Sequence, residues 1–123
     1  MLRASLIAFL LFGCSTLRDD LQRAETGYEA ARYERAQVWL RAIEDEVPQL
    51  TPRDRARYYY LRGMTALRLE DRDEALHFLS LAREEADEGG TLPERWSETL
   101  APTLESLTPT TATHTARAPQ TDP

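Results

Sequence analysis

The chain has 123 residues, 41% of them hydrophobic, which is enough for one compact domain with a modest core and too few for a second folded domain. Its 21 acidic and 15 basic residues give a formal net charge of −6, and this sign disfavours a nucleic-acid partner. The single cysteine excludes an intramolecular disulfide and a metal site built on paired thiolates.

The first residues have the layout of a secretory signal, because one basic residue, Arg3, precedes an apolar run over residues 4–12. A helix over that run rises only about 14 Å, roughly half of a hydrocarbon core, so we expect cleavage and not a membrane span. The run ends in Leu11-Phe12-Gly13-Cys14, which resembles the lipobox of bacterial lipoproteins. The resemblance implies that residues 1–13 are a cleaved signal peptide and that Cys14 carries the lipid. Phe12 departs from the pattern, since a smaller residue is usual there.

Lipidation at Cys14 would give the chain a stable membrane anchor, because diacylglycerol together with a further acyl chain such as palmitate holds far better than one chain. Ser15, and not Asp, follows the cysteine. By resemblance to the sorting rule of enteric bacteria, this implies the outer membrane, with the domain facing the periplasm. The alternative is that Cys14 is an ordinary buried thiol at the end of an apolar helix.

The segment after Cys14 predicts an all-α fold of four to five helices. Apolar residues at intervals of three and four from Leu17 to Ala31 predict a first amphipathic helix. The same spacing from Ala36 to Val47 predicts a second, which Pro48 should end. Short connections favour antiparallel helical hairpins.

Capping signals mark the next helices. Thr51 can cap a third helix, with Pro52 in its first turn. Asp71, with a glutamate three residues later, predicts the start of a fourth, which Gly89 and Gly90 should stop.

Pro93 begins a possible fifth helix whose Trp96, Leu100 and Leu104 would cover the open end of the core, and Pro102 should kink or stop it. We therefore assign residues 14–107 to one helical domain. The Thr-, Pro- and Ala-rich residues 108–123 have almost no large apolar side chain, so we expect a disordered tail.

The two expected hairpins show an internal repeat with an offset of 39 residues, since Ala24, Ala36 and Leu40 correspond to Gly63, Ala75 and Leu79. Small residues on both helices of each pair resemble the tetratricopeptide repeat. The resemblance covers residues 18–87 and implies a fragment of an α-solenoid. The period is longer than the usual 34 residues, and an unrelated four-helix bundle is the alternative.

The resemblance to the tetratricopeptide repeat implies that the first helix of each hairpin lines a concave binding face. It would place these residues side by side: Leu21, Glu25, Tyr28, Glu29, Arg57, Tyr60, Met64 and Arg68.

No catalytic constellation, metal site or cofactor motif emerges from the sequence, so we expect no enzyme, no cofactor and no small-molecule substrate. The most distinctive feature is the arginine- and tyrosine-rich stretch over residues 53–62, because both residue types are enriched at interface hot spots. Helical geometry cannot bury three successive tyrosines on one stripe, so we expect Tyr59 inside, Tyr60 near the groove and Tyr58 more exposed. The candidate partner-binding residues are Tyr28, Arg57, Tyr58, Tyr60, Met64 and Arg68.

The leading hypothesis is a membrane-anchored lipoprotein that acts as a non-catalytic adaptor between proteins in the bacterial envelope, for example in an outer-membrane assembly, a pilus or a secretion system. The alternative is a structural envelope protein that binds peptidoglycan or anionic surfaces through an arginine-rich face formed by Arg53, Arg57 and Arg62. A solvated arginine surface without any partner is the third interpretation of that stretch.

Overall fold

The structure is a computed structural model that describes the main chain of residues 12–109 and the side chains of residues 16–109. Every regular element in the described part is helical, so the predicted all-α class is confirmed. None of its helices is long and apolar enough to cross a membrane. The elements in chain order are α1 (Phe12–Glu29), α2 (Tyr33–Ala42), the 3-10 helix η1 (Glu44–Gln49), α3 (Pro52–Arg68), α4 (Arg72–Asp87) and α5 (Glu94–Leu107).

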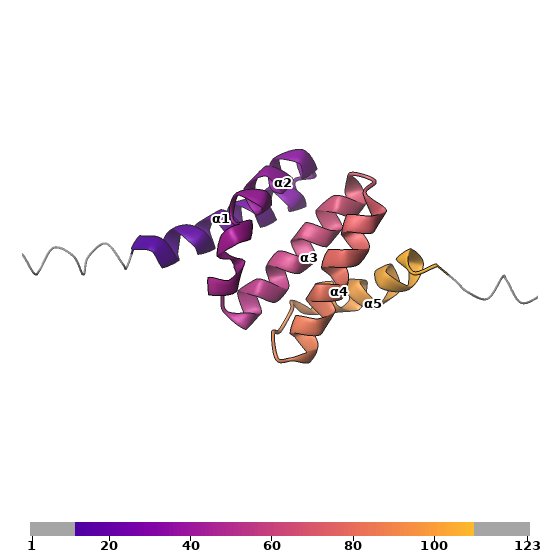
Figure 1. Ribbon diagram of the computed structural model, residues 1–123. Helices are drawn as coiled ribbons and strands as arrows, with labels where there is room; N and C mark the ends of the chain where they lie inside the picture. The colour runs from indigo at the N-terminus through magenta and orange to yellow at the C-terminus, as the bar shows by residue number, and fades with distance from the viewer. Residues whose placement is uncertain (1–11, 110–123) are drawn as a thin grey trace, which may run out of the picture.

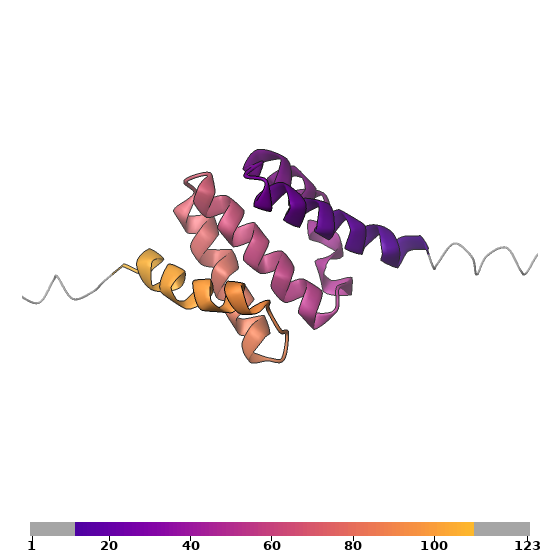
Figure 2. The same cartoon turned by 180° about the vertical axis from the view of Figure 1, so that it is seen from behind.

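The helices form two layers around α3 (Figures 1 and 2). Seen from the side shown in Figure 2, α1 and α5 lie in front, while α2 and α4 lie behind. Helix α3 contacts α1, α2, η1 and α4. The seven residues from Tyr60 to Ala66 are consequently all buried, whichever way they point on the helix. A helix surrounded in this way has no single amphipathic stripe. Its tyrosines and arginines can therefore be buried on more than one side.

The helix α2 is shorter than the sequence predicts, because the expected helix from Ala36 to Val47 divides in two. Helix α2 ends at Ala42, and the chain continues as η1 with Pro48 inside it. Proline cannot donate a main-chain hydrogen bond, and its ring clashes with the carbonyl four residues earlier in an α-helix. The tighter 3-10 geometry accommodates both restrictions.

The two predicted helix starts at Thr51 and Asp71 are confirmed. The Thr51 hydroxyl accepts a hydrogen bond from the Asp54 amide at 3.2 Å, and the Asp71 carboxylate accepts one from the Glu74 amide at 3.1 Å. Glu74 does not complete a reciprocal capping box, since its side chain instead pairs with Arg62 at 3.1 Å. The cap at the start of α4 is thereby joined to the core.

The turn between α1 and α2 has the same main-chain geometry as the turn between α3 and α4. Ala31 and Glu70, 39 residues apart, both adopt left-handed conformations, with φ of 58° and 65°. The predicted repeat offset therefore describes the turns as well as the side chains. Matching main-chain hydrogen bonds close the two turns, Arg32 N–H to Gly27 O at 2.8 Å and Asp71 N–H to Ala66 O at 2.9 Å.

Close packing of α3 on α4 depends on Gly63, one of the small residues in the repeat. A Cβ atom at Gly63 would lie 2.5 Å from the Leu79 Cγ and 2.9 Å from the Leu79 amide nitrogen. The end of α4 also follows the prediction, since Gly89 has a φ of 111°, a conformation that favours glycine. Glycine thus serves two different purposes in the second hairpin.

Helix α5 continues through Pro102 to Leu107, so of the two expected effects, a kink or a stop, the stop does not occur. Pro102 lies on the exposed side, while Trp96, Leu100 and Leu104 are buried as predicted. The free energy gained by burying these three side chains offsets the loss of the main-chain hydrogen bond that proline cannot donate. Residues 110–123 of the predicted tail lie outside the described residues.

Candidate partner-binding surface

The candidate surface lies along the side of α3 that faces α1 and α5, and we call it the groove face. On α3 it is formed by residues three and four apart, which lie on one side of a helix. Residues with the same spacing form a matching row on α1. Helix α5 lies on the same side of α3 (Figure 2) and supplies the third edge. The groove face consists of Arg18, Leu21, Glu25 and Tyr28 on α1, Arg53, Arg57, Tyr60, Met64 and Arg68 on α3, and Arg95, Trp96 and Thr99 on α5.

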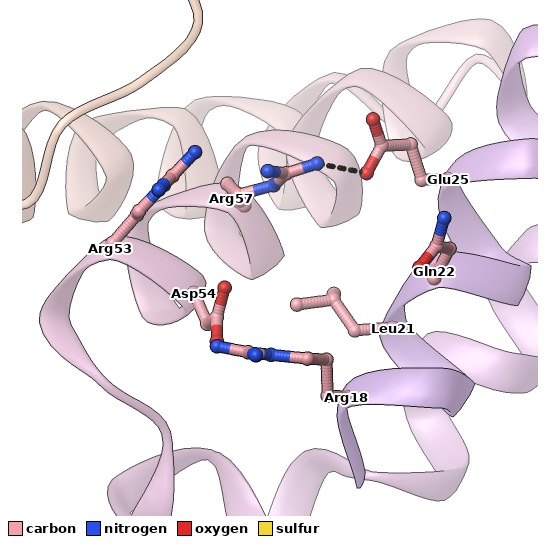
Figure 3. A pocket seen from close by; sticks show the side chains of 7 residues that line it. All are labelled: Arg18, Leu21, Gln22, Glu25, Arg53, Asp54 and Arg57. Atoms are coloured by element: carbon pink, nitrogen blue, oxygen red, sulfur yellow. Dashed lines mark hydrogen bonds and ion pairs between the residues drawn. The ribbon is translucent and has the colours of Figure 1, made fainter. Parts of the chain in front are cut away.

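At one end, the groove face contains a charged cavity of about 330 Å³ between α1 and the start of α3 (Figure 3). Arg57 forms an ion pair with Glu25 across the cavity, and Arg18 pairs with Asp54 at 3.4 Å. Arg53 is exposed at the rim and forms no ion pair with any residue whose side chain the structure describes. The lining therefore holds three arginines and two carboxylates, one positive charge in excess.

The indole of Trp96 joins α5 to the centre of the groove face. It stacks on the Tyr60 ring with centroids 4.6 Å apart and an interplanar angle of 11°. The Arg57 guanidinium lies 5.5 Å from the centroid of the indole, within the range of a cation–π contact. Arg57 is thus held between Glu25 on α1 and Trp96 on α5.

The sequence predicts a core position for Trp96, and its contact with the binding candidates is seen only in the structure. The enrichment of tryptophan at interface hot spots was the available signal.

At the other end of the groove face, Tyr28 and Arg68 meet. The tyrosine ring lies 5.6 Å from the ring of Tyr33, and Arg68 lies over Tyr33 at 5.9 Å. A hydrogen bond to the Tyr28 hydroxyl is the main cause that raises the pKa of Arg68. Burial raises the pKa of Tyr60 to about 12, against the opposing effect of Arg68 and Arg95 nearby. The face therefore brings together four of the predicted residues: Tyr28, Arg57, Tyr60 and Arg68.

Three members of the predicted set are buried and not available to a partner. Tyr58 was expected to be the most exposed of the three tyrosines, but it is only 1% exposed. Its hydroxyl accepts a hydrogen bond from Arg62 at 3.0 Å on the side of α3 away from the groove face, and burial raises its pKa. Tyr60 and Met64 are on the groove side of α3 but buried beneath the surface. Tyr59, expected inside, is only partly buried.

The predicted arginine-rich face of Arg53, Arg57 and Arg62 does not exist as one surface. Arg62 is 5% exposed, pairs with Glu74 at 3.1 Å, and lies 4.7 Å from the centroid of the Phe78 ring. It follows Arg57 by five residues, which is about 140° around a helix, so it faces a different neighbour. Only Arg53 and Arg57 share the cavity.

The candidate lipidation site, Cys14, lies within α1, but its side chain is outside the described residues. Over the described residues, no group of three or more His, Cys, Asp or Glu side chains is arranged to hold a metal ion. Comparison of the chain with protein-family models, with curated proteins and with solved structures gives no match.

Proposed function

We propose that this chain is a bacterial lipoprotein, anchored through Cys14, which acts as a non-catalytic adaptor and holds a partner protein on its groove face. The proposal includes a tetratricopeptide-like arrangement of the two hairpins, which their matching turns support. The outer membrane, with the domain facing the periplasm, is its proposed location. Assembly with an outer-membrane complex, a pilus or a secretion system fits this role.

The observation that carries the proposal is that Tyr28 of α1 and arginines of α1, α3 and α5 lie on one accessible face, above the buried stack of Tyr60 and Trp96. Tyr28 and Arg57 are half-buried, so they are held in place by neighbours while part of each side chain is still open to solvent. Tyrosine and arginine side chains that are fixed in this way lose little conformational entropy on binding. Such residues commonly carry most of the free energy of an interface.

Partner capture tests the adaptor role. The full chain, purified from membranes in mild detergent, should retain a defined partner, and Tyr28→Ala with Arg57→Ala should reduce its recovery several-fold. The matched control is Val38→Ala with Arg83→Ala, two exposed positions on α2 and α4. Recovery of free monomer alone from wild-type cells, or equal loss in both double variants, would contradict the proposal.

The anchor has its own test. The wild-type chain should incorporate a labelled fatty acid and fractionate with membranes, and Cys14→Ser should lose both properties. A variant that kept its label would place the lipid elsewhere and refute the assignment of Cys14.

A second candidate function, attachment to peptidoglycan or another anionic surface, is favoured by Arg53, which is exposed beside Arg57 at the rim of the cavity. Simple attraction of this kind is screened by salt, because the Debye length is about 10 Å at 0.1 M and about 3 Å at 1 M. Binding to purified cell wall that disappears between these concentrations would favour attachment. Specific capture of one protein that survives the same change would favour the adaptor.

A further inference from the structure

Two arginines of the groove face have a carboxylate partner, since Arg18 pairs with Asp54 and Arg57 with Glu25. Arg68 and Arg95 resemble Arg53, since they are exposed and form no ion pair with a carboxylate in the part of the chain described. Exposed arginines of this kind also lie elsewhere, for example at Arg35 and Arg83. The groove face is distinguished by having them at both of its ends.

The unpaired arginines lie at both ends of the groove face. Arg53 is in the first turn of α3, at the rim of the charged cavity. Arg68 is the last residue of α3, so it lies at the other end, and Arg95 is on the first turn of α5. The middle is already neutralised, because Arg57 pairs with Glu25. A complementary ligand would therefore be acidic at its two ends and uncharged at its centre.

We infer that the groove face binds an acidic segment of a partner protein, with one carboxylate group at Arg53 and another at Arg68. This inference rests on the proposed adaptor function and specifies the chemistry of the partner. The charge pattern also sets a spacing. Arg53 and Arg68 are 15 positions apart on α3, or about 22 Å along the helix axis. An extended chain covers that distance in about six or seven residues.

Synthetic peptides provide the probe. The first peptide carries two glutamates at each end with six uncharged residues between the pairs, and the second has glutamine in place of every glutamate. Both are labelled with a fluorophore and titrated with the full chain in detergent. We expect the acidic peptide to bind at least tenfold more tightly at low salt, and the difference to shrink as salt is raised.

A pair of double variants tests whether the groove face is the site. Arg53→Ala with Arg68→Ala should weaken binding of the acidic peptide about tenfold, because two charge pairs are lost. Arg35→Ala with Arg83→Ala removes the same charge from two exposed positions elsewhere and should change the affinity less than twofold. Closing the gap between the glutamate pairs to two residues should also weaken binding, since the two ends could no longer be reached together.

Several outcomes would overturn the inference. Equal affinity for the acidic and glutamine peptides would show that charge does not select the ligand, and the adaptor role would survive through an uncharged partner. Equal loss in the two double variants would show a non-specific effect of net charge. Binding to purified peptidoglycan in preference to the acidic peptide would overturn the inference and favour attachment to the wall. Absence of peptide binding would overturn it as well, while a partner captured from membranes would still support an adaptor.

Discussion

The two helical hairpins share their turns and differ in their surroundings. Helices α1 and α3 end at equivalent positions, and α2 and α4 begin at equivalent positions, 39 residues apart. An arginine–aromatic contact is repeated as well, since Arg23 lies 5.3 Å from the centroid of the Trp39 ring and Arg62 lies 4.7 Å from that of Phe78.

The surroundings then give the two arginines opposite environments. The side chain of Arg23 is 61% exposed and that of Arg62 is 5% exposed, because α3 lies at the centre of the fold and α1 at its edge. Equivalent local sequence thus produces equivalent local geometry, while the neighbouring elements decide what is buried. Substitutions at matched positions of the two hairpins test this effect of burial.

The largest difference should appear at the two arginines themselves. Arg62→Ala leaves the Glu74 carboxylate with only its longer ion pair to Arg41, at 3.8 Å, and the buried Tyr58 hydroxyl without its donor, so it should lower the free energy of unfolding by about 3 kcal/mol. Arg23→Ala should lower it by less than about 1 kcal/mol, because its ion pair with Asp20 is exposed. Urea unfolding followed by circular dichroism measures both.

A double variant provides the control. Arg62→Met with Glu74→Leu removes the cation together with its carboxylate, so it should be more stable than Arg62→Ala. Equal destabilisation by Arg62→Ala and Arg23→Ala would contradict the claim that burial separates the hairpins.

Alkaline pH should act on the second hairpin through Tyr60, whose equivalent in the first hairpin is Leu21. Burial raises the pKa of Tyr60 from the ordinary tyrosine value of about 10 to about 12 in the folded chain. The folded chain therefore keeps its proton over that interval while the unfolded chain loses it, so stability is intact below pH 10 and falls as the pH rises to 12. The loss from this one group is about 2 to 3 kcal/mol.

Tyr60→Phe should remove this part of the pH dependence, measured as the urea midpoint at pH 9 and pH 11 (about one unit either side of the unfolded pKa of 10). An unchanged pH profile in that variant would show that another group is responsible.

Two glycine substitutions each introduce into one hairpin the residue found at the equivalent position of the other hairpin. Gly63→Ala introduces the residue found at Ala24, and its Cβ would meet Leu79. We expect a loss of about 1 to 3 kcal/mol despite the better helix propensity of alanine. Gly27→Ala introduces the residue found at Ala66, in a place where the nearest atom is 3.6 Å away.

Gly27→Ala should therefore be neutral or stabilise by up to about 1 kcal/mol. Thermal unfolding distinguishes the two directions. A stabilising Gly63→Ala would mean that α3 and α4 can separate without cost.

The smallest effect should be equal in the two hairpins. Ala31→Gly and Glu70→Gly each relieve a left-handed conformation at the end of a helix and should stabilise by about 0.5 kcal/mol, part of the gain being lost to the greater freedom of glycine in the unfolded chain. Unequal shifts in the melting temperature would show that the turns are less alike than their hydrogen bonds indicate.

Features that depend on a few neighbouring residues could be predicted from the local sequence. The caps at Thr51 and Asp71, the stop at Gly89 and the repeat of the two turns are formed within about one helical turn of main chain, so the local residue types specify them. The need for a small residue at Gly63 could also be predicted, because the repeat has small residues where the two helices of a hairpin pack together.

Packing of the whole domain sets which side chains of α3 lie toward the groove face. Three successive tyrosines point in directions about 100° apart, and a rule based on one buried stripe places Tyr58 outside. Since neighbours surround α3, Tyr58 and Arg62 are buried against α4 and η1, and the groove face is left to Arg57 and Tyr60 with Trp96 from α5. The contact with Trp96 joins residues far apart in the chain, and no local pattern specifies such a pair.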